Sequence, residues 1–122
     1  MGGSNGYMPS LIANYRQLYS ITIVDLRGSI VLGETSLTLR RTLRDLVDRG
    51  RTKIILNFSR VDSIDSAGVG ELAGAYLPIK SSGGDLKFLS PTEKVHGVLR
   101  ITQLDQVFEV HRDEQTAIDS FS

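Results

Sequence analysis

Apolar and polar residues along this chain follow two periods in turn, one typical of strands and the other typical of helices. Runs rich in β-branched and other apolar residues predict strands at 11–17, 20–27, 53–58, 85–89 and 107–110. Apolar residues at helical spacing predict helices at 34–49, from 66 to the Ser81–Gly84 stretch, from 91 through 99, and at 113–121. A loop is expected at 59–65, between the third strand and the second helix.

The second of these helices carries a clear amphipathic stripe, and the third carries a clear start signal. The stripe consists of Val69, Leu72, Ala73, Tyr76 and Leu77. Pro78 is expected to kink or weaken that helix near its end. Ser90 and Glu93 form a capping-box pattern, with Pro91 at the first helical position, so the third helix is expected to begin there.

Strands that alternate with helices imply right-handed crossovers and a largely parallel sheet. The first two strands are separated by a very short link, which predicts an antiparallel hairpin. The expected fold class is therefore α/β, with a mixed, mostly parallel sheet and about four packed helices. A length of 122 residues suits one domain. We assign 11–122 to that domain and regard 1–10, beginning MGGSNG, as a flexible leader or cloning remnant.

Charge and composition exclude several classes of protein. Fourteen basic residues balance fourteen acidic ones, so no general electrostatic attraction to nucleic acid or to an anionic membrane is expected. The chain has no cysteine, which removes disulfides, thiolate metal sites and thiol nucleophiles and fits a reducing compartment such as the cytoplasm. No apolar run approaches the roughly 20 residues of a membrane span, and the N-terminus lacks the features of a signal peptide.

The most unusual stretch runs from Ile64 to Gly70, where a strand is expected to lead into a helix. Asp65 and Ser66 occupy the cap and first-turn positions, next to backbone amides that have no partner within the helix. A phosphate on Ser66 would lie near those amides and the positive end of the helix dipole. Gly68 and Gly70 leave the first turn bare, which would let another protein approach closely. Taken alone, however, Asp65 and Ser66 are more often a simple helix cap.

A third glycine follows in the same helix, at position 74. Glycine costs about 1 kcal/mol relative to alanine inside a helix, so three glycines in seven positions indicate that close approach outweighs helix stability here. We expect Gly74 to pack against the sheet.

The segment IDSAGVGELAGAY, preceded by KIILNFSRVDS, resembles the STAS domain of bacterial anti-sigma factor antagonists. VDLRG resembles the entry of that domain, and SSGGDLKFLSPTEKVHGVLRITQLDQVFEV resembles its second half. The resemblance covers roughly residues 11–121 and is specific in combination.

The resemblance implies partner switching without catalysis by this chain. Ser66 would be the phosphoacceptor for an anti-sigma factor serine kinase of the histidine-kinase-like ATPase fold. A PP2C-type phosphatase would remove the phosphate and restore the unphosphorylated form. The unphosphorylated form would bind the kinase and release the sigma factor. The partner-binding residues would be Ser63, Ile64, Asp65, Ser66, Ala67, Gly68, Gly70 and Glu71, with Val69 in the core.

One position departs from the family pattern. Many antagonists carry an aspartate where this chain has Val31, and that aspartate helps at the kinase interface. The departure leaves room for a relative that docks without being phosphorylated, for example a free-standing subunit of a lipid-transport complex. Ala67 replaces a second hydroxyl residue, so Ser66 is the one hydroxyl between Asp65 and Gly70.

Other functions fit the sequence less well. Gly68–Ala73 fits the residue types of a dinucleotide-binding motif. Phe58, at the end of the preceding predicted strand, lies too far from Gly68 for that motif, and the chain is too short for a second nucleotide-binding half. A hydrolase with Ser66 as nucleophile would need a base, and His96 and His111 stand in no catalytic motif. No metal site or cofactor is expected from two histidines without cysteine. The arginines around residues 40–60 resemble a solvated helix face rather than a nucleic-acid site.

Overall fold

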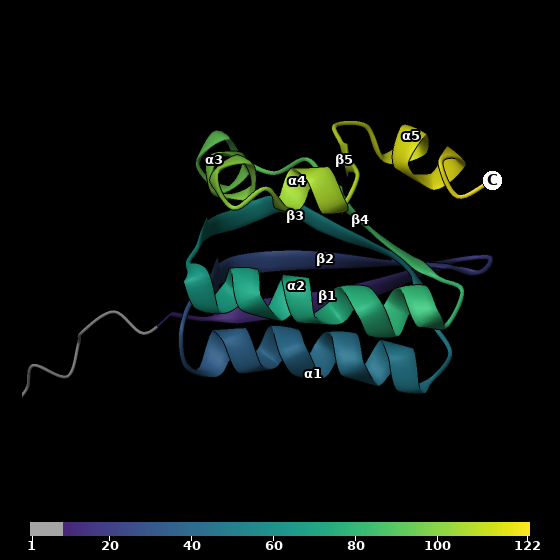
Figure 1. The fold of residues 1–122 in the computed structure, drawn as a ribbon, viewed down its shortest axis with the longest axis horizontal. Helices are drawn as coiled ribbons and strands as arrows, with labels where there is room; N and C mark the ends of the chain where they lie inside the picture. The colour runs from purple at the N-terminus through teal and green to yellow at the C-terminus, as the bar shows by residue number, and fades with distance from the viewer. Residues whose placement is uncertain (1–8) are drawn as a thin grey trace, which may run out of the picture.

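The computed structural model describes residues 9–122, which form a five-stranded sheet with helices on both faces (Figure 1). In chain order the elements are β1 (Leu11–Leu18), β2 (Ile21–Ile30), α1 (Glu34–Asp48), β3 (Lys53–Ile64), α2 (Ser66–Ser81), β4 (Asp85–Leu89), α3 (Glu93–Ile101), α4 (Leu104–Val107), β5 (Val110–His111) and α5 (Glu114–Asp119). The expected leader lies largely outside the described residues. Within them, the carbonyl of Ser10 accepts a hydrogen bond from the N–H of Ser29 at 3.0 Å.

The strands lie in the order β1-β2-β3-β4-β5, with β1 and β2 antiparallel and each later pair parallel. The predicted mixed sheet and N-terminal hairpin are therefore confirmed. Gly28 is needed where β2 passes the start of β1, because a Cβ there would lie 2.0 Å from the carbonyl oxygen of Ser10. Its φ of 125° is also a conformation that other residues rarely adopt.

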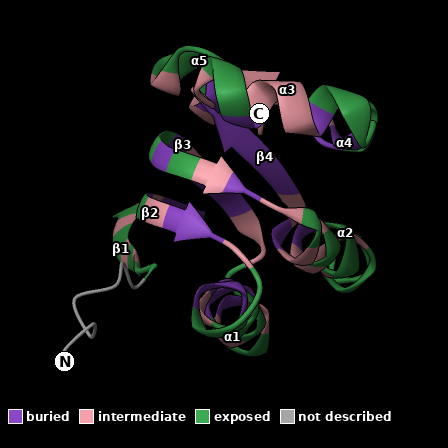
Figure 2. Ribbon diagram, turned by 90° about the vertical axis from the view of Figure 1, so that its left-hand side faces the viewer, coloured by how far each residue is buried: buried purple, intermediate pink, exposed green. Residues whose placement is uncertain are grey.

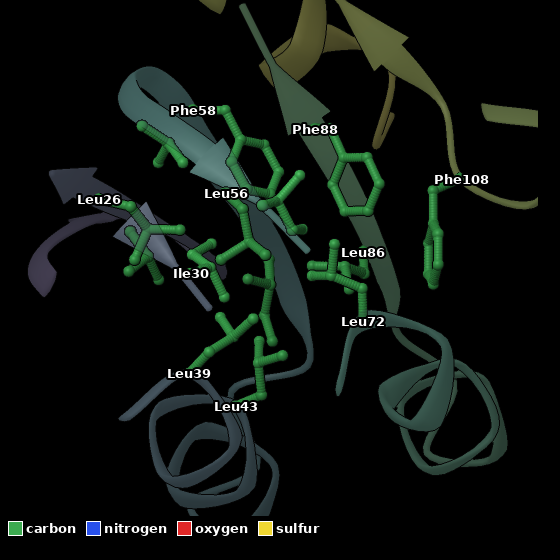
Figure 3. Close-up of a cluster of buried hydrophobic side chains, with 14 of the residues drawn as sticks. Leu26, Ile30, Leu39, Leu43, Leu56, Phe58, Leu72, Leu86, Phe88 and Phe108 are labelled. Carbon is green, nitrogen blue, oxygen red and sulfur yellow. The ribbon is translucent and has the colours of Figure 1, made fainter. Parts of the chain in front are cut away.

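The main core lies between the sheet and helices α1 and α2, which run side by side, and residues of α3 and α4 close it near β4 (Figures 1 and 2). Figure 3 shows Leu39 and Leu43 of α1 and Leu72 of α2 pointing toward the buried side chains of the sheet. The rings of Phe58 and Phe88 meet edge to face at 5.1 Å, and Phe108 lies 4.9 Å from Phe88. A second cluster on the opposite face packs under α5 and consists of Ile21, Ile23, Ile55, Leu89 and Ala117.

The loop predicted at 59–65 is wrong, because β3 continues to Ile64. The polar residues of this stretch are typical of a loop. The stretch is nevertheless a strand that pairs in parallel with the end of β2, from Arg27 opposite Arg60 to Ile30 opposite Ile64. A register shift between Asp25 and Arg27 lets the longer β3 follow β2. The strand extension carries the chain directly into the cap of α2.

Three other details of the sequence prediction are wrong. Thr92, not Ser90, caps α3, and its Oγ1 accepts a hydrogen bond from Val95 N at 3.3 Å. The first helical position is held by Glu93, and Pro91 lies before the cap. Ser90 instead has a φ of 52° and donates its hydroxyl to the carbonyl of Arg112. The strand expected at 107–110 is a helical turn followed by the short β5, because Leu104 and Phe108 enter the core four residues apart.

The apolar stripe of α2 also differs from the prediction. Leu72 and Ile79 are fully buried, whereas Leu77 is 68% exposed and Ala73 is exposed. The helix continues through Pro78 to Ser81. A Cβ at Gly74 would meet nothing within 4 Å, so the expected contact of this glycine with the sheet is absent. Among the helices of residues 9–122, none is long and apolar enough to cross a membrane.

Candidate functional site

Helices α1 and α2 begin at the same end of the sheet, after the carboxyl ends of the parallel strands β2 and β3 (Figure 1). Ser66 is the first residue of α2 and is exposed. The backbone N–H of Asp65 donates to the carbonyl of Ile30 at 3.1 Å, so the turn into α2 is attached to the end of β2. The predicted phosphoacceptor therefore lies where the β3–α2 connection contacts the end of β2.

Asp65 caps α2 as predicted, and it does more than cap. Its Oδ1 accepts hydrogen bonds from the N–H groups of Ala67 at 3.0 Å and Gly68 at 3.2 Å. Its Oδ2 accepts a third, from the N–H of Leu32 in the β2–α1 loop, at 2.9 Å. Partial burial opposes ionisation, but these backbone donors prevail and hold the pKa of Asp65 below its usual range. One carboxylate therefore joins the first turn of α2 to the neighbouring loop.

The β2–α1 loop has further hydrogen bonds of its own. Val31 N donates to Thr35 Oγ1, and the Thr35 hydroxyl donates to Val31 O, both at 2.9 Å. Ser36 N also donates to Val31 O, at 3.1 Å. Gly33, at the N-cap of α1, offers no side chain to the free amides of that helix. Leu32, between these fixed points, is 81% exposed.

The predicted partner-binding residues divide into an exposed and a buried group. Ile64 is only 6% exposed and belongs to the main core, so its side chain is not at a surface rim. Gly68 is also buried, and a Cβ there would lie 2.8 Å from the carbonyl oxygen of Ile30 and 2.7 Å from Ile64 Cγ1. The close approach that this glycine permits is therefore to its own sheet. Gly70, in contrast, is exposed, with open space around it.

The remaining predicted partner-binding residues reach the surface. Ser63 and Ala67 are half-buried, and so is Glu71, whose carboxylate forms an ion pair with Arg40 of α1 at 2.8 Å. Beyond this pair, a groove of about 400 Å³ lies between α1 and α2 and passes Gly74. The ion pair joins the second turns of the two helices.

The two histidines lie on other elements. His96 is on α3, and His111 is in β5, where its Nε2 lies 2.8 Å from Glu109 Oε1. Across residues 9–122 there is no group of three or more metal-ligating side chains placed to hold an ion. The arrangement around Ser66 offers an exposed hydroxyl, a capping carboxylate and a fixed loop, which suit recognition by another protein.

Sequence reasoning did not find Leu32 as part of this site. Its contact with Asp65 joins residues 33 positions apart, and a leucine that follows a strand gives no signal of exposure. The short run from Val31 to Gly33, without a charged side chain, was the available hint.

Comparisons with known proteins agree with this architecture. The STAS domain family matches residues 13–117. A Thermotoga maritima protein named as a candidate anti-sigma factor antagonist is 39% identical over 67 residues, which cover 55% of this chain and 59% of that relative. The match thus spans about three fifths of the relative's length.

Solved structures extend the likeness to nearly the whole chain. The crystal structure of a candidate anti-sigma factor antagonist from Thermotoga maritima superposes with a TM-score of 0.80 at 28% identity and covers 88% of this chain and 92% of that one. The Bacillus cell fate determinant SpoIIAA in its phosphorylated form gives a TM-score of 0.70 at 22% identity, covering 91% of this chain and 100% of that one, and so shares the fold.

Proposed function

The chain belongs to the STAS domain family, and we propose that within this family it acts as an anti-sigma factor antagonist switched by phosphorylation of Ser66. In its unphosphorylated form it binds an anti-sigma factor serine kinase of the histidine-kinase-like ATPase fold and releases the sigma factor. Phosphorylation ends that binding, and a PP2C-type phosphatase restores it. The observation that carries the proposal is the exposed Ser66 hydroxyl at the start of α2, beside the Asp65 cap.

The electrostatics of the site support a switch at the surface. A phosphate adds about −1.5 to −2 charges at neutral pH. Ser66 directly follows Asp65, so the added charge joins an existing carboxylate, while Glu71 of the same helix is already paired with Arg40. The Asp65 carboxylate already binds two of the first amides of α2. A partner fitted against this surface would meet charge repulsion and added bulk, while the core beneath stays unchanged.

Most of the residues expected at the interface are available to a partner. Ser63, Ala67, Gly70 and Glu71 are half-buried or exposed around Ser66 and form the proposed docking surface with Asp65. Ile64 and Gly68 support that surface from below. The chain supplies a hydroxyl and a docking surface, and the proposed role in the cytoplasm requires no catalysis by its own residues.

A second function is favoured by one observation, the valine at position 31. The family resemblance predicts an aspartate there, which helps at the kinase interface in many antagonists, and this chain lacks it. A docking subunit of another complex, such as one for lipid transport, would use the same surface without phosphorylation. The two functions differ in whether Ser66 is modified.

Intact-mass spectrometry separates them. The protein is incubated with Mg²⁺-ATP and each purified anti-sigma factor kinase of its genome, beside Ser66→Ala and the hydroxyl control Ser59→Ala, an exposed serine outside the docking surface. One added phosphate, about 80 Da, in the wild type and in Ser59→Ala but not in Ser66→Ala supports the switch. Binding of the kinase without any mass gain supports the unmodified docking function. If the wild type neither binds a kinase nor gains mass, the antagonist proposal is contradicted.

A further inference from the structure

Leu32 is exposed in a place where the backbone is fixed. Single exposed leucines are common on protein surfaces and need no explanation by themselves. Leu32, however, is 81% exposed while its N–H is bound to Asp65, and the adjacent Val31 is bound on both its N–H and its carbonyl. A side chain presented from such a loop loses little backbone freedom when it binds a partner.

Two apolar neighbours extend this surface. Leu37, in the first turn of α1, is 37% exposed, and Val31 is half-buried. The N–H of Leu37 donates to the carbonyl of Gly33 at 3.2 Å, which attaches the start of α1 to the loop. Val31, Leu32 and Leu37 are here called the apolar patch. The hydrogen bond from Leu32 N to the carboxylate of Asp65 brings its loop next to the residue that precedes Ser66.

We propose that Leu32 is the apolar anchor of the partner-binding surface, and that the anti-sigma factor offers it an apolar recess. This inference rests on the proposed function and specifies the chemistry of its partner. The run from Val31 to Gly33 has no charged side chain, and Leu32 is its most exposed apolar side chain, so a partner that covers it gains by removing apolar surface from water. Recognition at the β2–α1 loop is thus by burial of apolar surface.

The apolar contact at Leu32 explains why a phosphate on Ser66 would strongly weaken partner binding. An apolar contact binds well only if it excludes water at its edges. Leu32 N is bound to the carboxylate of Asp65, the residue before Ser66, so closing the contact would remove water from a phosphate that carries nearly two charges. Leu32 contributes affinity for the partner, and the phosphorylation state of Ser66 determines whether the contact at Leu32 can form.

Isothermal titration of each purified anti-sigma factor kinase of the same genome, without ATP, tests the inference. The variants are Leu32→Ser, Leu32→Met, and Leu77→Ser as a matched control, since Leu77 is 68% exposed at the far end of α2. We expect Leu32→Ser to weaken binding about tenfold or more, because a buried leucine side chain is lost from the interface. Leu32→Met keeps the apolar volume and should bind within a few-fold of the wild type. Leu77→Ser should bind like the wild type.

The outcomes separate this inference from the function on which it rests. If the wild type binds a kinase and Leu32→Ser binds equally well, Leu32 is no anchor, while the antagonist function stands. If Leu77→Ser loses as much affinity as Leu32→Ser, the effect is not local and the inference fails. If neither the wild type nor Ser66→Ala binds any of these kinases, both proposals fail. Thermal unfolding of each variant accompanies the titrations, and unchanged midpoints are expected for both exposed leucines.

Discussion

The Asp65 carboxylate and the Leu32 backbone are joined by a hydrogen bond of 2.9 Å that spans 33 residues of sequence. The other oxygen of the same carboxylate caps α2, directly beside Ser66. The loop that presents Leu32 and the helix that presents Ser66 consequently share one support. A change at Asp65 should reach both, and this makes it the most informative position for testing how the site is held together.

Replacing Asp65 should uncouple the loop from the helix. Asp65→Ala removes all three hydrogen bonds, and loss of an N-cap costs about 0.5–2 kcal/mol of folding free energy. Asp65→Asn keeps one acceptor oxygen, so it should lose less stability while giving up part of the network. Urea unfolding measures the stability, and amide hydrogen exchange at Leu32 reports the loop, where faster exchange is expected in both variants.

Asp113 provides the matched control for this experiment. Its carboxylate caps α5 by accepting from Thr116 N at 2.9 Å. Asp113→Ala should therefore destabilise the protein without changing exchange at Leu32. If Asp65→Ala leaves that exchange rate as it is in the wild type, the carboxylate does not hold the loop.

The stability of the fold should decline in acid, in part through Asp25. Arg16 donates two hydrogen bonds to this carboxylate, at 2.6 and 2.9 Å, and Asn57 adds a third at 2.8 Å. The Arg16 guanidinium, opposed by partial burial, holds the pKa of Asp25 below its usual range. A carboxyl whose pKa is lower when folded contributes stability above its unfolded pKa of about 3.9, and this is lost as pH falls through the folded pKa.

Urea unfolding between pH 7 and pH 2 measures this dependence. The wild type should lose stability steadily below about pH 4, and Asp25→Asn should show a shallower loss over the same range. Arg16 also binds Glu114 of α5 at 2.7 Å, so the acid-induced loss should include loosening of α5. Equal slopes for the two proteins would show that Asp25 is not among the groups responsible.

Local patterns in the sequence were sufficient for much of the fold. The hairpin, the buried strands and the long helices follow from apolar periodicity, and the Asp65 cap follows from residue type. The extension of β3 could not be predicted, because Arg60 and Asp62 are exposed polar residues and the strand there depends on pairing with β2. Ser90 fitted a capping box by its letters, but its hydroxyl donates to the distant carbonyl of Arg112.

The candidate site follows from the sequence only in part. Ser66 is predicted as the phosphoacceptor because a helix start, a glycine pattern and a family resemblance coincide there. The position of Leu32 is not predicted, since apolar side chains are usually assigned to a core and its backbone is bound to a residue 33 positions away. Gly68 was assigned to the partner surface, although what a glycine permits depends on which atoms a Cβ would meet. Those atoms belong to Ile30 and Ile64, which the sequence does not place.

The glycines of α2 should respond oppositely to alanine. Gly68→Ala puts a Cβ within 2.8 Å of the Ile30 carbonyl and should cost about 1–3 kcal/mol, as overpacking of a core does. Gly70→Ala enters open space and should gain up to about 1 kcal/mol from helix propensity. Urea unfolding of the two variants measures both effects. Equal stabilities would mean that the first turn of α2 does not need the close approach at Gly68.

The same pair gives a test of the docking surface. Gly70 is bare and exposed near Ser66, so a methyl group there should hinder a close partner without harming the fold. Titration of the anti-sigma factor kinase should show weaker binding by Gly70→Ala than by the wild type. Undiminished binding would place the partner's contacts away from this turn of α2.

Ser66→Asp should weaken partner binding while the fold keeps its stability. The side chain is exposed at the first position of α2, and an acidic group there gains about 0.3–1 kcal/mol from the helix dipole, against repulsion from neighbouring acids such as Asp62 and Asp65. The two effects oppose each other, so the free energy of unfolding should stay within about 1 kcal/mol of the wild type. Ser66→Ala should be similarly stable and should bind the kinase constitutively. Circular dichroism with urea unfolding measures the fold, and titration measures the binding. A Ser66→Asp protein that binds as tightly as Ser66→Ala would argue against charge as the switch, and one that unfolds would mean that the switch acts through the fold rather than at its surface.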